Sequence, residues 1–389
     1  MLPLLAETHN VEVMAQEPQH VVFENNPHIA KLTVRKPGDL PADGNHWQQW
    51  FAHRGREYDR WFNLSHSCEG VLALLPGQTQ FHWPAAWRRK YCGVNYLEYV
   101  HDIVGVRHAF DPRFYPTEAE TQHASETLDK VRGAGGYRHV VGIVLSGSRL
   151  DKSWPYMPLL VGKLVRELNV AVVLFGSEAE TKIAKHIQDF VAEYNSGYSG
   201  MHAAISPDKA KPSWPIRRSL TTLQRCDLVI SPDTGLAWGV AMEAVPKIML
   251  LSHASPVNIT KHWRNTLPLF ADQKRVDCWP CHKLHDTIET CRKAENAEAA
   301  ACIADISHEE VFVAAKAALR GENYGRDRSL FREGNVGLQP EQCGGDTPDD
   351  VECRPVARRP VVSLGVRNRD RLGHDAPDTA DGSGCLTRR

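Results

Sequence analysis

Short apolar runs alternate with amphipathic stretches along most of this 389-residue chain. The runs are rich in β-branched side chains and bounded by Gly, Pro or Ser, which is typical of strands buried on both faces of a parallel sheet. Hydrophobic residues at helical spacing fill the segments between them. We therefore expect strands at residues 11–15, 140–145, 170–175, 226–230 and 247–251, and helices at 157–168, 178–194 and 236–245.

The repeated order of strand, helix and strand predicts a doubly wound α/β fold. Residues 126–320 carry the pattern clearly, and residues 1–125 carry it more weakly, with strands near Val11 and Val71. We expect two Rossmann-like domains with these bounds. Such a domain opens with a strand and a glycine-bearing loop before its first helix, whereas residues 1–7 resemble the end of a helix. The N-terminal domain is therefore expected to lack its first strand.

The segment 321–389 differs in composition from the rest of the chain. It contains eleven arginines and no lysine, ten glycines, five prolines, and only Tyr324 and Phe331 as aromatic residues. So little apolar surface cannot offset the conformational entropy lost on ordering a chain. We expect a disordered C-terminal tail.

Charge and hydropathy exclude several functional classes. The 46 Lys and Arg nearly balance the 47 Asp and Glu, for a formal net charge of −1. Non-specific nucleic-acid binding depends on a basic surface, so no nucleic-acid partner is expected. No stretch approaches the roughly 20 apolar residues of a membrane span, and no secretory signal opens the sequence. We expect a cytoplasmic protein with at most peripheral membrane contact.

The first candidate binding site is the loop that follows the predicted strand 140–145. It lies at the carboxyl edge of the sheet, where doubly wound folds bind their ligands. Gly147 and Ser148 allow close approach of the backbone, and Arg149 and Lys152 supply positive charge, a combination that suits a phosphate or pyrophosphate. The alternative is a plain strand-to-helix loop with solvated charges.

The second candidate, residues 231–236, follows the predicted strand 226–230. Gly235 permits a tight turn, and Thr234 can cap the next helix, whose unpaired amides favour an anion. Asp233 is repelled by phosphate, so we expect it to cap the helix or to accept a hydrogen bond from a sugar hydroxyl. A capping pair without any ligand is the alternative.

Four cysteines, Cys278, Cys281, Cys291 and Cys302, lie within 25 residues of one another. A C-x2-C pair with two further thiols can hold a structural zinc ion through four thiolates. The later spacings are wider than those of a second C-x2-C pair, so buried free thiols and redox-active disulfides stay open as alternatives.

Together these segments resemble glycosyltransferase family 9, the ADP-heptose:lipopolysaccharide heptosyltransferases. The likeness covers residues 139–320 best. Residues 148–155 resemble the family's stretch ending K-x-W-P, residues 175–180 its G-G-x-x-E segment, and residues 233–236 its D-T-G-L motif. The four cysteines follow a pattern common near the C-terminus of family members.

This resemblance implies a GT-B fold, with two Rossmann-like domains facing a cleft. It implies transfer of a heptose or related sugar from ADP-heptose or another nucleotide sugar, without a metal, to a lipopolysaccharide-type or other surface glycan, free or lipid-linked. No cofactor is implied besides the nucleotide-sugar co-substrate. By their place in the motifs, the donor-binding residues would be Ser148, Lys152, Glu180, Asp233, Thr234, Gly235 and Leu236.

Two departures from the family pattern change the expected chemistry. Ala237 and Trp238 stand where the family has a small residue and a histidine, so the donor need not be heptose. The family's first strand and glycine-aspartate loop, which carry the general base, have no counterpart at the start of this sequence, and a missing base costs about 10²- to 10⁴-fold in rate. A catalytically impaired nucleotide-sugar-binding protein is therefore the alternative function. A zinc-stabilised interaction module, resting on the cysteines alone, is a third.

Overall fold

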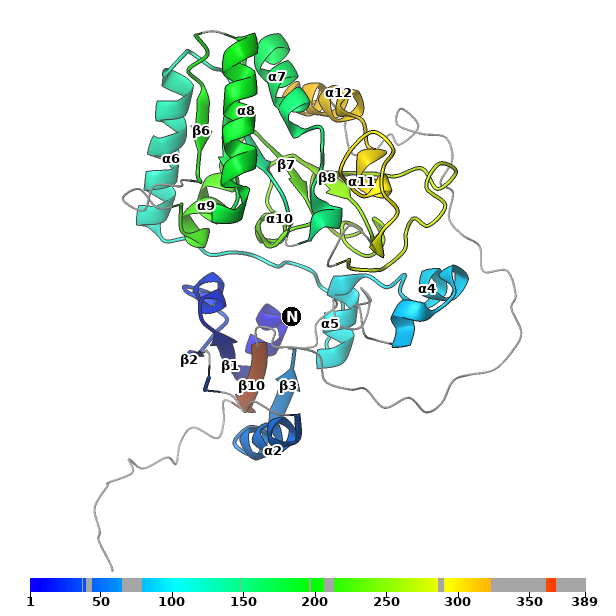
Figure 1. Cartoon of the computed structure of the whole chain (residues 1–389). Coiled ribbons are helices and arrows are strands. Elements are labelled where there is room, and N and C mark those ends of the chain that lie inside the picture. The colour runs from blue at the N-terminus through cyan, green and yellow to red at the C-terminus, as the bar shows by residue number, and fades with distance from the viewer. Residues whose placement is uncertain are drawn as a thin grey trace, which may run out of the picture.

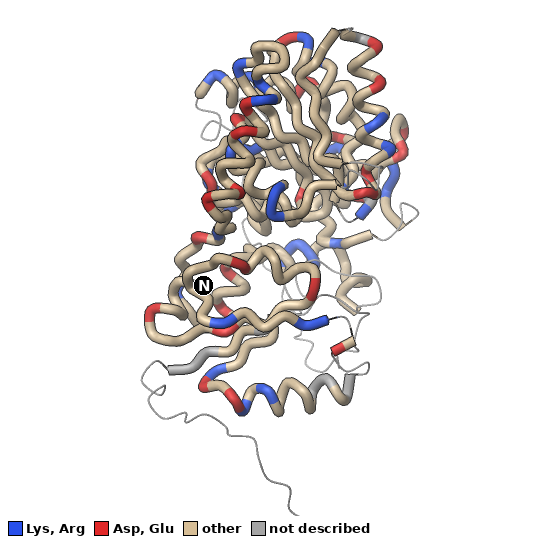
Figure 2. Tube along the Cα trace, turned by 90° about the vertical axis from the view of Figure 1, so that its left-hand side faces the viewer, with Lys and Arg blue, Asp and Glu red and all other residues tan. Residues whose placement is uncertain are grey.

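The computed structural model describes residues 1–36, 38–39, 44–64, 79–147, 149–195, 197–205, 213–285, 290–322 and 362–368. Two lobes, each built on a β-sheet, face one another and are joined by the segment between α5 (Tyr96–Val104) and α6 (Glu118–Gly133) (Figure 1). Acidic and basic residues are interspersed over both lobes (Figure 2). None of the described helices has the length and apolar character needed to cross a bilayer. The predicted α/β fold class is confirmed.

The second lobe contains a six-stranded parallel sheet in the order β6-β5-β4-β7-β8-β9. Its strands are β4 (Val140–Val144), β5 (Ala171–Phe175), β6 (Met201–Ala203), β7 (Leu228–Pro232), β8 (Lys247–Leu251) and β9 (Thr266–Phe270). This is the 3-2-1-4-5-6 order of a doubly wound Rossmann sheet. Every residue of β4, β5, β7 and β8 is buried, which explains why these strands are unbroken apolar runs in the sequence.

Helices cover both faces of this sheet. Besides α6, they are α7 (Met157–Leu168), α8 (Thr181–Tyr194), α9 (Ile216–Leu223), α10 (Gly235–Gly239), α11 (Ala301–Ala304) and α12 (His308–Leu319), with the 3-10 turns η3 (Leu150–Lys152) and η4 (Glu178–Glu180). One face packs α7, α8 and α12 against alternate residues of β5, Val172 and Leu174. The other face packs α6 and α9 against Val173 and Phe175. This alternation places the two helical layers on opposite sides of the sheet.

The helix predicted at 236–245 is shorter than expected. Its counterpart α10 ends at Gly239, where an added Cβ atom would meet the side chain of Leu220 in α9 at 2.2 Å. Close packing of α9 against this glycine, together with the low helix propensity of glycine, explains the early end.

The first lobe contains a four-stranded sheet in the order β2-β1-β10-β3. Its elements are α1 (Leu2–Ala6), β1 (His9–Gln16), η1 (Gln19–Phe23), β2 (Lys31–Arg35), α2 (Gly44–Gly55), β3 (Arg60–Asn63), η2 (Thr79–His82), α4 (Ala85–Tyr91), α5 and β10 (Val362–Asn368). The strand predicted near Val11 is β1, which pairs in parallel with β2. The strand predicted near Val71 lies outside the described residues.

Strand β10 corrects the expectation of disorder at residues 362–368. It comes from the segment predicted to be disordered, 321–389, and it lies between β1 and β3, antiparallel to both. It also occupies the position beside β1 where a doubly wound sheet has its first strand. In the element order no strand precedes β1, as expected for a domain that lacks its first strand, and β10 fills that place antiparallel to its neighbours. Composition did not predict this strand because a short segment needs few apolar residues once neighbours on both sides supply hydrogen bonds and a core. Apart from Gly321 and Glu322, the rest of the segment lies outside the described residues.

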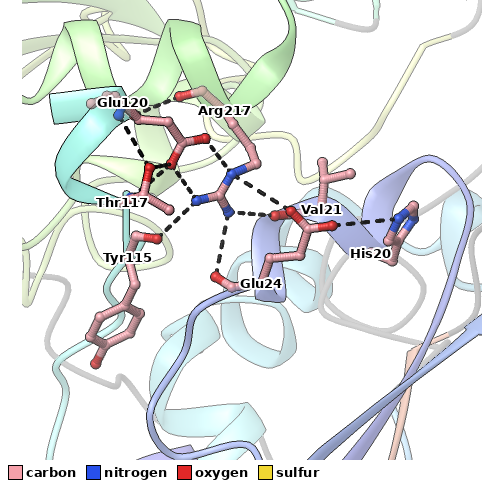
Figure 3. Close-up of polar contacts among 8 residues, drawn as sticks. His20, Val21, Glu24, Tyr115, Thr117, Glu120 and Arg217 are labelled. Atoms are coloured by element: carbon pink, nitrogen blue, oxygen red, sulfur yellow. Dashed lines mark hydrogen bonds and ion pairs between the residues drawn. The ribbon is translucent and has the colours of Figure 1, made fainter. Parts of the chain in front are cut away.

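Arg217, in the first turn of α9, joins the two lobes (Figure 3). Its guanidinium donates to both carboxylate oxygens of Glu120 in α6, each at 2.7 Å, and to the carbonyl oxygen of Tyr115 at 3.0 Å. It also donates to the carbonyl oxygen of Val21 in η1 at 2.8 Å and pairs with the Glu24 carboxylate at 3.7 Å. Arg217 is buried, so one side chain connects the second lobe, the segment between the lobes and the first lobe.

Lys247 is a fully buried cation at the start of β8. Its Nζ donates to the carbonyl oxygens of Glu243 at 2.9 Å and Val245 at 2.7 Å. Burial lowers the pKa of this ammonium to about 7, against a smaller opposing effect of the Glu243 charge.

We expect the free energy of unfolding to rise with pH between about pH 7 and 10 because of Lys247. In this range the unfolded chain, with a lysine pKa of 10.5, binds more protons than the folded chain, so raising the pH favours folding by at most about 1.4 kcal/mol per pH unit. Urea unfolding across this range should show the rise in the wild type and a smaller one in Lys247→Met. Identical pH dependence in the two proteins would contradict the lowered pKa.

Candidate functional site

A cavity of about 580 Å³ lies between the two lobes. Phe23 of η1 and Tyr96 of α5 line it from the first lobe, and Asp233, Gly235 and Trp238 line it from the second. Its size and its largely aliphatic and aromatic wall with a few polar groups are typical of a small-molecule site.

The second-lobe wall of this cavity lies at the switch point of the parallel sheet. Strands β4 and β7 are adjacent, and the chain continues from β4 toward one edge and from β7 toward the other. Doubly wound folds bind ligands in the crevice outside the carboxyl ends of these two strands. The two loops predicted as binding sites, 145–155 and 231–236, therefore meet at this point.

Lys152 and Asp233 form a buried ion pair across the switch point. Lys152 Nζ lies 2.9 Å from Asp233 Oδ2, and the two residues are 5% and 6% exposed. Burial raises the pKa of Asp233, but the charges of Lys152 and His253 and two hydrogen bonds outweigh it and hold the pKa below its usual range. Gly147 makes room for the lysine, because an added Cβ would lie 2.7 Å from Lys152 Cδ. Sequence alone did not predict this pairing.

The turn after β7 holds the other predicted residues of the D-T-G-L motif. Thr234 caps α10, its hydroxyl oxygen accepting from the amide of Ala237 at 3.2 Å, as expected. Gly235 is not in the left-handed backbone region, so a tight turn is not the reason for glycine here. Instead, an added Cβ would meet nothing within 4 Å, which leaves the backbone open to the cavity. Leu236 packs against the hydrophobic cluster that contains residues of α6 and α9.

Glu180 is not brought to this pair. Glu180 forms a capping box with Ser177 at η4 and accepts a hydrogen bond from the Ser146 hydroxyl at 2.8 Å. It thereby ties the loop after β5 to the loop after β4. Ser148 lies outside the described residues.

A second buried pair, Asp151 and His253, adjoins the first and was missed from the sequence. Asp151 Oδ2 lies 3.2 Å from His253 Nδ1 and accepts from the Ser252 hydroxyl at 3.3 Å. Burial raises the pKa of Asp151, but the opposing effect of His253 and Lys152 is larger, so the pKa lies below its usual range. His253 lies just beyond the carboxyl end of β8. Ligand-binding residues of doubly wound folds lie at such strand ends, so this position was the feature from which the sequence could have indicated His253.

Trp238 links the switch point to the first lobe. Its Nε1 donates to Asp233 Oδ1 at 3.0 Å, and its ring stacks on Tyr96 of α5 with centroids 6.2 Å apart. The aromatic ring at this position therefore orients Asp233 and forms part of the contact between the lobes.

The four cysteines lie in the segment that follows β9 and are free thiols. Burial raises the pKa of Cys281 to about 12 and of Cys291 to about 11, and it also raises the pKa of Cys278 and Cys302. Among the residues that the structure describes, no three His, Cys, Asp or Glu side chains are arranged to hold a metal ion. A structural zinc ion therefore stays a prediction from the sequence.

Comparison with known proteins finds likeness only at the level of structure. No family model matches the sequence, and no curated protein matches it. A glycosyl transferase family 9 structure from Veillonella parvula is similar with a TM-score of 0.51 and 16% identity, over 79% of this chain and 88% of that one. The ADP-heptose lps heptosyltransferase II of E. coli gives a TM-score of 0.44 and 14% identity, over 80% of this chain and 89% of that one. The chain therefore shares the two-lobed α/β fold of a family 9 glycosyltransferase.

Proposed function

We propose that this protein is a glycosyltransferase whose nucleotide-sugar donor binds at the switch point of the second lobe. The observation that carries the proposal is the Lys152–Asp233 pair, placed where the loops after β4 and β7 meet beside the cavity between the lobes. The likeness in fold to a family 9 glycosyltransferase supports the same assignment.

In this proposal, donor binding rearranges the buried pair. Lys152 is neutralised by Asp233, so a diphosphate has to take the carboxylate's place beside the ammonium. Asp233 then accepts a hydrogen bond from a hydroxyl group of the donor sugar, which is the role expected of it from the sequence. Gly235 allows the ligand to approach the backbone. Exchange of one anion for another keeps the buried lysine paired, which limits the cost of the change.

The finer assignments rest on the sequence motifs. We propose ADP-heptose or a related nucleotide sugar as donor, and a surface glycan of the lipopolysaccharide type, free or lipid-linked, as acceptor. We propose that the transfer needs no metal. We also propose that the protein is cytoplasmic and makes at most peripheral contact with a membrane. Lys152 would stabilise the departing diphosphate electrostatically.

A donor-binding protein with little transfer activity is the second candidate. The pairing of the cavity carboxylates with cations favours it. Among the described residues, Asp111 and Asp233 are the carboxylates of the cavity wall. Arg113 Nε donates to both oxygens of Asp111, at 2.8 and 2.9 Å, and Lys152 holds Asp233. A carboxylate whose pKa is held low by a buried cation is a weak proton acceptor, so Asp233 does not serve readily as a general base. Both oxygens of Asp111 are engaged by Arg113.

We expect ADP and ADP-heptose, but not UDP or GDP, to raise the thermal unfolding temperature of the full chain. A ligand at 100 times its dissociation constant adds about 2.7 kcal/mol, a rise of roughly 5 to 10 °C for a domain of about 200 residues such as the second lobe. The rise should disappear in Lys152→Ala and persist in Lys163→Ala, whose partner Glu309 lies outside the cavity. Each variant is compared with its own unliganded temperature. No shift with any nucleotide would overturn the proposed site.

Turnover separates the two candidate functions once binding is shown. The chain is incubated with ADP-heptose and a lipopolysaccharide core acceptor, with and without EDTA, and release of ADP is measured. Release unaffected by EDTA supports metal-independent transfer. Binding without release assigns the protein to the donor-binding alternative.

A further inference from the structure

Strand β10 completes a sheet that would otherwise be split. It pairs with β1 over seven residues, from His9 opposite Asn368 to Ala15 opposite Val362, and with β3 from Arg60 opposite Val366 to Asn63 opposite Ser363. In the sheet order, β1 and β3 are separated by this one strand. Without it, both would present unpaired amides and carbonyls along facing edges, which is a ready template for another strand.

The core side of this gap accepts an apolar side chain. Leu364 is 1% exposed and belongs to the hydrophobic cluster of the first lobe, with Leu5 of α1, Val11 and Val13 of β1, and Val104 of α5. The residues around it come from the first 106 residues of the chain. A segment some 250 residues later therefore supplies a central residue of that core.

The other side of the gap accepts only glycine at the next position. A Cβ atom on Gly365 would lie 2.4 Å from the ring of Tyr58. Tyr58 precedes β3, and its hydroxyl donates to Glu12 Oε2 of β1 at 2.7 Å. In the register, Glu12 and Trp61 lie directly opposite Gly365 on its two sides. The Tyr58 side chain thus extends across β10 from the segment before β3 to β1. The absence of a side chain at Gly365 leaves room for the tyrosine ring beside the β10 backbone.

We propose that the gap between β1 and β3 is a binding site for an extended segment, and that residues 362–368 of the same chain are its ligand. Recognition comes from the two ladders of backbone hydrogen bonds, the apolar site for Leu364 and the glycine-specific contact with Tyr58. The 39 residues between Glu322 and Val362 can span up to about 130 Å, so the segment can reach its site within one molecule. Such a tether keeps the local concentration of the segment high.

Hydrogen exchange of the full chain tests this assignment. In Gly365→Val, the added side chain collides with Tyr58, so we expect exchange of residues 9–16 and 60–63 to accelerate by about tenfold or more. Strands β4 and β5 of the second lobe serve as the internal reference and should keep wild-type protection. Gly365→Ala gives a milder version of the same collision, in case the valine variant is produced poorly. Gly337→Val, in the same C-terminal segment but outside the strand, is the matched control and should behave as the wild type.

Removing the obstacle should rescue the strand. In Gly365→Val/Tyr58→Ala the ring is gone, so protection of residues 9–16 and 60–63 should return toward the wild-type level. Unchanged exchange in Gly365→Val, or acceleration that Tyr58→Ala does not relieve, would overturn the proposal. Size-exclusion chromatography at several concentrations tests the same-chain assignment, for which a monomer is expected. A dimer that persists on dilution and that Gly365→Val dissociates would show that a second copy supplies the strand.

Discussion

Arg217→Ala is expected to lower the free energy of unfolding by about 2 to 3 kcal/mol, because it removes a buried guanidinium that donates to a carboxylate and to backbone carbonyl oxygens. The change leaves Glu120 without its cation and removes the donor from the carbonyl oxygens of Tyr115 and Val21. Because these groups belong to both lobes and to the segment between them (Figure 3), the loss also removes a contact that sets how the lobes face one another. Urea unfolding at neutral pH measures it.

The same variant should lose part of its sensitivity to acid. The pKa of Glu120 is lowered from 4.5 to about 2, chiefly by the Arg217 guanidinium and also by hydrogen bonds from Thr117. A carboxylate with a lowered pKa stabilises the fold above the unfolded value, and this stabilisation is lost as the pH falls from about 4.5 to 2. The wild type should therefore lose more stability than Arg217→Ala across that range.

Arg166→Ala is the matched control for this prediction. Arg166 pairs with Glu167 on the surface, with the arginine side chain 65% exposed, and exposed pairs contribute little to stability. A stability loss in Arg217→Ala no larger than that of this control would show that the contact between the lobes is energetically unimportant.

Lys152→Met and Asp233→Asn are each expected to cost about 3 to 5 kcal/mol of stability, whereas the double variant should cost much less than their sum. Each single change leaves one buried group without its counter-charge, and the double change removes both charges together. Residues in direct contact couple in this way by up to about 3 kcal/mol. Urea unfolding of the four proteins gives the coupling directly, and additive losses would contradict a tight ion pair.

The response to nucleotide should distinguish the two single variants. In Asp233→Asn the Lys152 ammonium has lost its carboxylate, so a diphosphate meets no competitor, and ADP should raise the unfolding temperature of this variant more than that of the wild type. In Lys152→Met ADP should have no effect. Equal responses of the wild type and Asp233→Asn would mean that the pair stays closed when nucleotide binds.

The sequence alone determined the second lobe and the location of its candidate site. Short unbroken apolar runs rich in β-branched residues are typical of strands buried on both faces, and helices between successive strands favour a parallel sheet. All carboxyl ends of a parallel sheet lie at one edge, so the loops holding Lys152 and Asp233 had to share that edge. The capping role of Thr234 was also local, since a cap depends on residues within one turn.

Only the tertiary structure decided which of these side chains meet and how the first lobe is completed. Lys152 and Asp233 are 81 residues apart, and no periodicity specifies that their charges cancel each other at the switch point. The early end of α10 depends on Leu220 of another helix, and the contact between Trp238 and Tyr96 joins two lobes. Strand β10 is the extreme case, because its seven residues gain a core and two hydrogen-bonded neighbours only from the distant N-terminal lobe. The local hydrophobic pattern indicates which side chains a segment can bury. Which other segment they pack against depends on the packing of the whole chain.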